Sequence, residues 1–196
     1  HTAGQIITFL EEISDPISCI QSSQTQPPLL GAYYYPWYRH GKRPRHWNEN
    51  QRCISVHDWP VNGPYTSKDP ETISRHLAEA SQAGLDLLII NWQVGANGLH
   101  KDDLNATDAM FNAVEKSDSP IRLAILVAIN TPDLEEVRKT LSLLTDHYSS
   151  RPSYLRIDHR IPVWFFLSNT FLEFFFHCFQ ELESLCKDVH PVATGS

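Results

Sequence analysis

The feature that most constrains the fold is an alternation of short apolar runs with longer amphipathic segments. Residues 85–92 (LDLLIINW), 122–129 (RLAILVAI) and 160–167 (RIPVWFFL) are nearly continuous apolar runs, a pattern typical of strands covered on both faces. Residues 30–38 form a fourth strand candidate. A helical pattern follows each strand, at residues 69–83, 102–116, 132–148 and 171–187. The sequence therefore predicts four consecutive β-then-α units.

Repeated units of this kind predict a parallel sheet with right-handed crossovers, either a doubly wound open sheet or a β/α barrel. No GxGxxG or GxxxxGK[ST] motif follows a predicted strand, which removes the phosphate-binding forms of the open sheet. A complete barrel has eight units and usually needs about 250 residues, whereas this chain has 196. We therefore predict an α/β protein of the (β/α)8 TIM-barrel type with about four βα units present.

The polar segment 21–28, QSSQTQPP, separates this half barrel from what precedes it. Its composition and its two final prolines are typical of a linker. We assign residues 1–28 to a lead-in and linker, and residues 29–196 to the N-terminal half of a barrel. The chain opens with His1 rather than Met, and we expect it to be a fragment of something longer.

Charge and composition argue against several classes of function. The net charge of −7 is unlike the basic surface of a general nucleic-acid binder, and no apolar run reaches the length of a membrane span. The four cysteines lack zinc-site spacing. The histidines at positions 40, 46, 57 and 100 fall in separate predicted loops. We expect no metal and no cofactor.

Functional groups of a β/α barrel gather where its strands end. The stretch 31–48, GAYYYPWYRHGKRPRHWN, combines aromatic rings with imidazole and guanidinium groups at the end of the first predicted strand. Amide or aromatic groups also end later strands, at Trp92, Asn130 and Asn169. Such side chains stack on a pyranose and hydrogen-bond its hydroxyls. The pattern indicates a polar, ring-shaped ligand such as a sugar.

Four motifs then follow in order: YYPWY (34–38), HWN (46–48), GPYTSKDP (63–70) and LIINW (88–92). In order and spacing they resemble the start of glycoside hydrolase family 99, which contains endo-α-mannosidases and endo-α-mannanases. The similarity is strong over 30–92 and weaker through 103–167. The resemblance implies a complete (β/α)8 barrel that cleaves α-mannosidic linkages inside a glycan, with retention and without a metal.

The resemblance also implies which side chains line the sugar subsites: Tyr34, Tyr35, Trp37, His46, Trp47 and Trp92. Each of these side chains could instead pack inside the protein. Alternate side chains of an extended 34–38 segment must face the helices, and Trp92, the strongest candidate for a subsite platform, can also belong to the core. The basic residues Arg39 and Arg45 are expected to be solvated loop charges.

The in-site acids of the family are missing from this half. The HIEPY-type ending of the family's third strand is replaced by LVAIN (126–130), so Ala128 stands where the glutamate would be. Ser168 stands where the aspartate of a YDSY-type ending would be, and no EWHEG-type segment follows. Because glycoside hydrolysis generally needs a placed carboxyl pair, we predict no catalytic residue here and no turnover by this chain alone.

Three functions stay open. The chain is the first half of a retaining, endo-acting glycoside hydrolase, or a glycan-binding or glycan-processing relative that lost the acids, or a half-barrel module that pairs with the remainder of the barrel or another copy. The expected partner is a mannose-containing glycan, with no nucleic acid and no membrane span. The resemblance suggests a secreted, periplasmic or secretory-pathway location, and the sequence itself leaves the compartment open.

Overall fold

The computed structural model of the protein describes residues 28–47, 58–117, 119–131, 133–167 and 189–193. Its strands form a five-stranded parallel sheet in the order β1-β2-β3-β4-β5. The strands are β1 (Gly31–Tyr34), β2 (Leu87–Val94), β3 (Arg122–Ile129), β4 (Ile161–Leu167) and β5 (Val189–Ala193). The helices are α2 (Pro70–Gln82), α3 (Lys101–Lys116) and α4 (Leu134–Leu143), and a π-helical turn, η2 (Leu144–Tyr148), continues α4. The predicted alternation and parallel sheet are confirmed.

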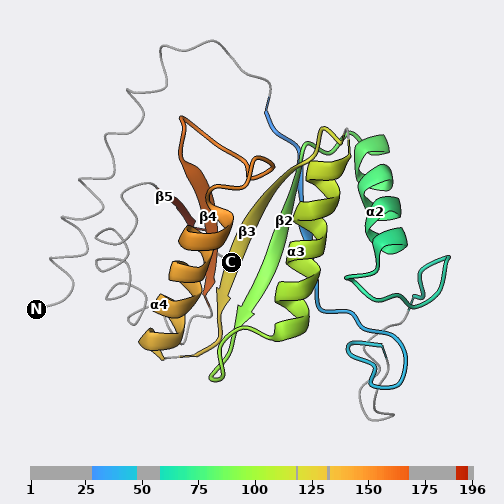
Figure 1. The fold of residues 1–196 in the computed structure, drawn as a ribbon, viewed down its shortest axis with the longest axis horizontal. Coiled ribbons are helices and arrows are strands. Elements are labelled where there is room, and N and C mark those ends of the chain that lie inside the picture. The colour runs from blue at the N-terminus through green and yellow to red at the C-terminus, as the bar shows by residue number, and fades with distance from the viewer. Residues whose placement is uncertain (1–27, 48–57, 118, 132, 168–188, 194–196) are drawn as a thin grey trace, which may run out of the picture.

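The three helices lie on one side of the sheet (Figure 1). Sequential parallel strands joined by right-handed crossovers place every helix on the same face. Side chains on that face meet the helices, as the hydrogen bond from Trp92 in β2 to Thr107 in α3 shows. Because side chains alternate along a strand, the neighbours Asn91 and Gln93 point to the opposite face. We call that opposite face, which a closed barrel would turn toward its axis, the inner face.

The strand register aligns the inner face into rows that run across the sheet. One row contains Asn91, Leu126 and Trp164, and the next contains Gln93, Ala128 and Phe166. The second row is nearer the carboxyl ends of the strands, where function collects in barrels of this kind. The sheet therefore presents two layers of inner-facing side chains to whatever completes or occupies the barrel.

The predicted boundaries differ from the structure at both ends of the sheet. β1 stops at Tyr34 instead of running to residue 38, because Pro36 has no N–H for a ladder and lies in a turn. The sequence pattern missed β5, which pairs with β4 and lies last in the sheet order of the described residues; a proline such as Pro191 is tolerated in an edge strand. The predicted helix 171–187 and the lead-in 1–27 lie outside the described residues, so the division at residue 28 stays a prediction.

Helix capping and apolar burial explain the rest of the helix layer. Asp69 caps α2 by accepting a hydrogen bond from the Thr72 N–H at 3.0 Å, with Pro70 in the first turn, as predicted. The core between the sheet and the helices is fully buried, and it includes Ile90, Trp92, Met110, Phe111, Ile125, Val127 and Val137.

Within the described parts of the chain, no helix is both long and apolar enough to cross a membrane.

An aromatic cluster joins β1 to α2. The Tyr34 hydroxyl and the His76 Nδ1 lie 3.2 Å apart, and the Tyr65 ring meets the His76 ring edge-on at 4.9 Å. Burial is the main cause that lowers the pKa of His76, and the neighbouring Arg75 adds to it. The fold therefore favours the neutral imidazole.

This gives a stability prediction with a definite sign. A histidine whose pKa is lowered in the folded state binds fewer protons there than in the unfolded chain. The free energy of unfolding is therefore unaffected by this group above about pH 6.5 and decreases as the pH falls from there toward the lowered pKa. We expect the free energy of unfolding in urea to fall over that range, and His76→Phe, which keeps an aromatic ring without a titrating group, to flatten the fall. An identical pH slope in both proteins would contradict this.

Candidate functional site

A polar pocket of about 670 Å³ lies where β2 and β3 end. Loop residues after the two strands line it together with the first turn of α3 and one arginine from the loop after β1; they include Arg45, Gln93, Asn97, His100, Asp103 and Asn130. We call it the strand-end pocket. Amide, imidazole and guanidinium groups converge there, and such groups can bind the hydroxyls of a neutral polar ligand.

The loop that forms one side of this pocket is a tight turn. Gly95 and Gly98 exchange backbone hydrogen bonds of 3.3 and 3.0 Å, and Gly98 has a φ of +73°. A Cβ at Gly98 would also lie 2.6 Å from the Glu136 Oε2 of α4. The positive φ therefore favours glycine on conformational grounds, whereas the Glu136 carboxylate ends a flexible side chain that can move aside. The turn lies against α4.

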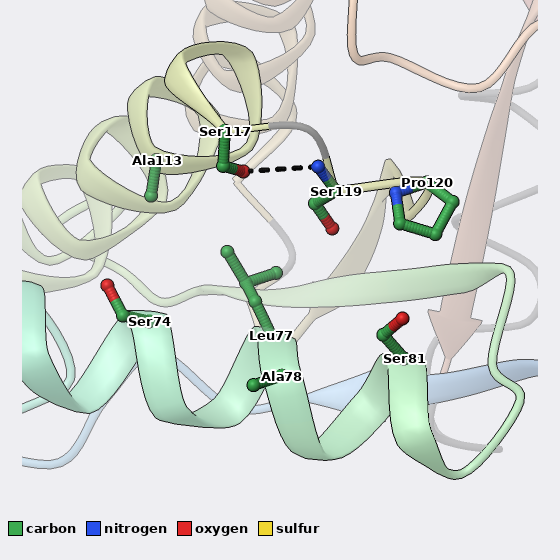
Figure 2. A pocket seen from close by; sticks show the side chains of 8 residues that line it. All are labelled: Ser74, Leu77, Ala78, Ser81, Ala113, Ser117, Ser119 and Pro120. Atoms are coloured by element: carbon green, nitrogen blue, oxygen red, sulfur yellow. Dashed lines mark hydrogen bonds between the residues drawn. The ribbon is translucent and has the colours of Figure 1, made fainter.

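A second hollow, of about 310 Å³, lies between α2 and α3 and is lined largely by serine and alanine (Figure 2). Ser81 at the end of α2 and Pro120 just before β3 place it toward the amino ends of the strands. In β/α barrels that end serves stability and the opposite end serves function. The strand-end pocket is therefore the better candidate site.

The exposed aromatic surface beside the strand-end pocket is a stack of three rings. Tyr35 is 40% exposed and stacks on Trp37 with centroids 4.6 Å apart and planes 27° apart. Trp37 in turn lies 5.0 Å from the His46 ring. Since His46 follows Arg45, which lines the pocket, the stack and the pocket share one loop. We call these residues the Tyr35–Trp37–His46 stack.

Two buried polar atoms near these strand ends lack a partner among the described residues: the Trp37 Nε1 and the Asn91 Oδ1. A buried polar group without a hydrogen bond costs about 1–3 kcal/mol. One is a donor and the other an acceptor, so a hydroxyl group, which both donates and accepts, has the chemistry to satisfy either.

The structure packs Tyr34 and Trp47 into the protein itself. Tyr34 lies in the cluster with His76. Trp47 is 6% exposed, donates its indole N–H to the Tyr65 carbonyl at 2.7 Å, and lies parallel to Trp59 with centroids 5.8 Å apart. The Trp47 ring and the Tyr34 hydroxyl thus have protein neighbours, and these two residues support the loop instead of forming its open surface.

The expectation of a sugar contact does not hold for Trp92 in this structure. Trp92 is 0% exposed, donates its indole N–H to the Thr107 hydroxyl at 3.0 Å, and meets the Tyr148 ring edge-on at 5.2 Å. The physical reason is the strand alternation: Trp92 faces the helices, and its neighbours Asn91 and Gln93 face the inner side. The same motif therefore points to the amides beside it.

The prediction that Arg39 and Arg45 are solvated loop charges is wrong. Arg39 is ion-paired with Asp102, and Arg45 with Asp103, at the start of α3. The adjacent acids Asp102 and Asp103 were a possible sequence indication of these ion pairs. Acids are favoured in a first helical turn because they complement the helix dipole, and here they also face the basic loop. Sequence reasoning missed the pairing since the partners are 63 and 58 residues apart.

The structure describes one of the two positions in this half where the family resemblance places an acid. Ala128 is 3% exposed and lies in the inner-face row between Gln93 and Phe166. Ser168 lies outside the described residues. In the regions that the structure describes, no group of three His, Cys, Asp or Glu side chains is placed to hold a metal ion.

Comparison with known proteins gives a consistent result. The sequence model of glycosyl hydrolase family 99 matches residues 29–175. A glycoprotein endo-alpha-1,2-mannosidase of Mus musculus is 24% identical over 172 residues, which are 71% of this chain and 37% of that protein. A human glycoprotein endo-alpha-1,2-mannosidase-like protein is 22% identical over 154 residues, or 65% of this chain and 33% of that protein. The chain thus spans about a third of the length of these relatives.

Solved structures agree on the fold. The GH99 endo-alpha-mannosidase from Bacteroides thetaiotaomicron superposes with a TM-score of 0.56 at 18% identity, covering 69% of this chain and 44% of that one. A protein described as glycoside hydrolase-like gives a TM-score of 0.57 at 17% identity, covering 84% and 50%. The parallel sheet and its helices are therefore part of a TIM barrel, as predicted.

The two arginine pairs should differ sharply in their effect on stability. Asp103 is 1% exposed and Arg45 21%, whereas Arg39 and Asp102 are 33% and 22% exposed. Arg45→Ala leaves a buried carboxylate uncompensated, and we expect it to lower the free energy of unfolding by about 3 kcal/mol. Arg39→Ala, the matched control, breaks a pair near solvent and should cost less than about 1 kcal/mol. Urea denaturation measures both, and equal losses would show that Asp103 is not desolvated.

Proposed function

The chain belongs to glycosyl hydrolase family 99, and we propose that it binds a mannose-containing glycan on the Tyr35–Trp37–His46 stack and in the strand-end pocket. The observation that carries this is the stack itself. Tyr35 directly follows β1, is 40% exposed and stacks on Trp37, which itself lies against His46. Arg45, next to His46, lines a pocket of amide and imidazole groups. An open aromatic face next to hydrogen-bonding groups is the arrangement that a pyranose ring requires.

The unpartnered polar atoms support the same ligand. In this proposal, sugar hydroxyls reach the Trp37 Nε1 or the inner-facing Asn91 amide, either directly or through a bridging water. Arg45 and Asp103, which both line the pocket, are paired with each other. Lys101 also lines it, and the amide groups beside these charges suit a ligand rich in hydroxyls. The endo-alpha-mannosidase names of the relatives make mannose the first sugar to test.

Two versions of this function remain, and they differ in catalysis. In the first, residues 29–167 are the sugar-binding half of a retaining endo-glycosidase whose acids lie on further sequence. In the second, the protein binds or processes glycans without cleaving them, which is favoured by Ala128 in the inner-face row where the family resemblance places a glutamate. In both versions we propose no catalytic residue within this chain.

A titration tests the binding role. We expect α-1,2-mannobiose to bind weakly to the wild-type chain, as followed by NMR chemical-shift changes, and Trp37→Ala to weaken binding by about tenfold, equivalent to about 1.4 kcal/mol of lost ring contact. Trp92→Phe is the matched control: it also alters a tryptophan, but one inside the core, and it should leave the affinity unchanged. Equal affinity of wild type and Trp37→Ala would remove the stack from the site.

An activity assay tests the catalytic proposal. We expect no oligosaccharide release when the 196-residue chain is incubated with an α-mannan or a glucosylated high-mannose glycan. Ala128 stands where the family resemblance places a glutamate, and the Asp102 and Asp103 carboxylates are each paired with an arginine. Product analysis by mass spectrometry after prolonged incubation measures this, with a family-99 endo-mannosidase as the positive control. Release by this chain, and its loss on heating the protein, would overturn the proposal.

A further inference from the structure

We infer that Asp103 is a positioning residue, which acts through Arg45 to hold His46 at the edge of the Tyr35–Trp37–His46 stack. This rests on the proposed function, since the stack is the proposed sugar platform. Asp103 lies in the first turn of α3, far along the chain from the loop that it contacts.

The ion pair is two-pronged and buried. The Arg45 Nη1 contacts the Asp103 Oδ1, and the Arg45 Nη2 lies 3.3 Å from the Asp103 Oδ2. A guanidinium that meets both oxygens of a carboxylate fixes orientation as well as distance. Asp103 is held in turn by the helix, because its backbone N–H donates to the His100 carbonyl at 3.0 Å. The Arg45 side chain is thus anchored to a rigid element.

The loop carries this constraint to the next residue. Arg39 and Arg45 exchange two backbone hydrogen bonds, of 3.1 and 2.8 Å, which close the loop between them. His46 then has a φ of +62°, a left-handed conformation that costs about 1–2 kcal/mol for a residue with a Cβ. Such a conformation persists only where its surroundings enforce it. The anchored Arg45 is the residue directly before it.

The direction of the His46 ring depends on this backbone conformation. The ring lies 5.0 Å from Trp37 and 6.1 Å from Tyr38. If the anchor is loosened, His46 gains access to ordinary negative φ values, and its ring turns away from Trp37. The platform then loses its third ring, although its other rings are untouched.

The pair also sets the charge of the strand-end pocket. Arg45 and Asp103 both line it, and their pairing neutralises these two charges beside the amides of Gln93, Asn97 and Asn130. Lys101 also lines the cavity. A free Asp103 carboxylate or a free Arg45 would instead attract ions and water. The pairing therefore suits a neutral polyhydroxyl ligand on both geometric and electrostatic grounds.

The test compares Asp103→Asn with Asp108→Asn. Both remove one negative charge from α3, but Asp108 contacts Tyr148 and His147 on another flank. We expect trypsin to cleave Asp103→Asn about tenfold faster than wild type within residues 39–46, with unchanged cleavage elsewhere, as mapped by mass spectrometry. We expect α-1,2-mannobiose to bind Asp103→Asn about tenfold more weakly, and Asp108→Asn to match wild type in both measurements.

Arg45→Lys provides a second variant if Asp103→Asn does not fold. It keeps a positive charge opposite Asp103 but loses the two-pronged contact, so we expect the same local cleavage and weaker binding. Wild-type cleavage within 39–46, or wild-type affinity in a folded variant, overturns the positioning role. Uniformly faster cleavage along the whole chain also overturns it, because that indicates general destabilisation. If wild type itself does not bind the sugar, the proposed function falls and the sugar-positioning role with it, while the cleavage pattern still decides whether Asp103 holds the loop.

Discussion

The period-two alternation of side chains in a parallel sheet that is covered by helices governs which residues this protein can offer to a ligand. In β2, Ile90 and Trp92 must face the helices because Asn91 and Gln93 face the inner side. A one-residue change of register would exchange the two sets. The register is fixed by continuous pairing of β2 with β3 over its whole length, so the identity of the inner-facing rows follows from the backbone alone.

Local sequence patterns predicted the elements but not the direction of their side chains. Apolar runs located β2, β3 and β4, and Asp69 with Pro70 located the start of α2, since strand burial and helix capping depend on near neighbours. The motif LIINW identified the right strand end, yet its most conspicuous residue, Trp92, faces the core. Which of two adjacent residues faces a pocket depends on where the helices lie, and that is not a local property.

Long-range ion pairs were beyond sequence reasoning for a related reason. Arg39 and Arg45 were predicted to be loop charges because they lie in a run of basic residues, while Asp102 and Asp103 begin a helical pattern. Each reading is correct locally. Only the fold brings the loop after β1 next to the first turn of α3. Because Asp103 is buried there, removing either Arg45 or Asp103 is expected to lower the free energy of unfolding.

One inner-face row bears on whether this part of the protein could take part in cleavage, because it contains no acidic side chain. Gln93, Ala128 and Phe166 lie side by side near the carboxyl ends of β2, β3 and β4, where a glycosidase needs an acid within reach of the sugar. An amide, a methyl group and a phenyl ring can hold a ring through contacts and one hydrogen bond, but none of them can attack, donate or accept a proton at the glycosidic centre. In the proposed function, this row therefore contributes to binding a sugar, and any cleavage would need acids from outside the row.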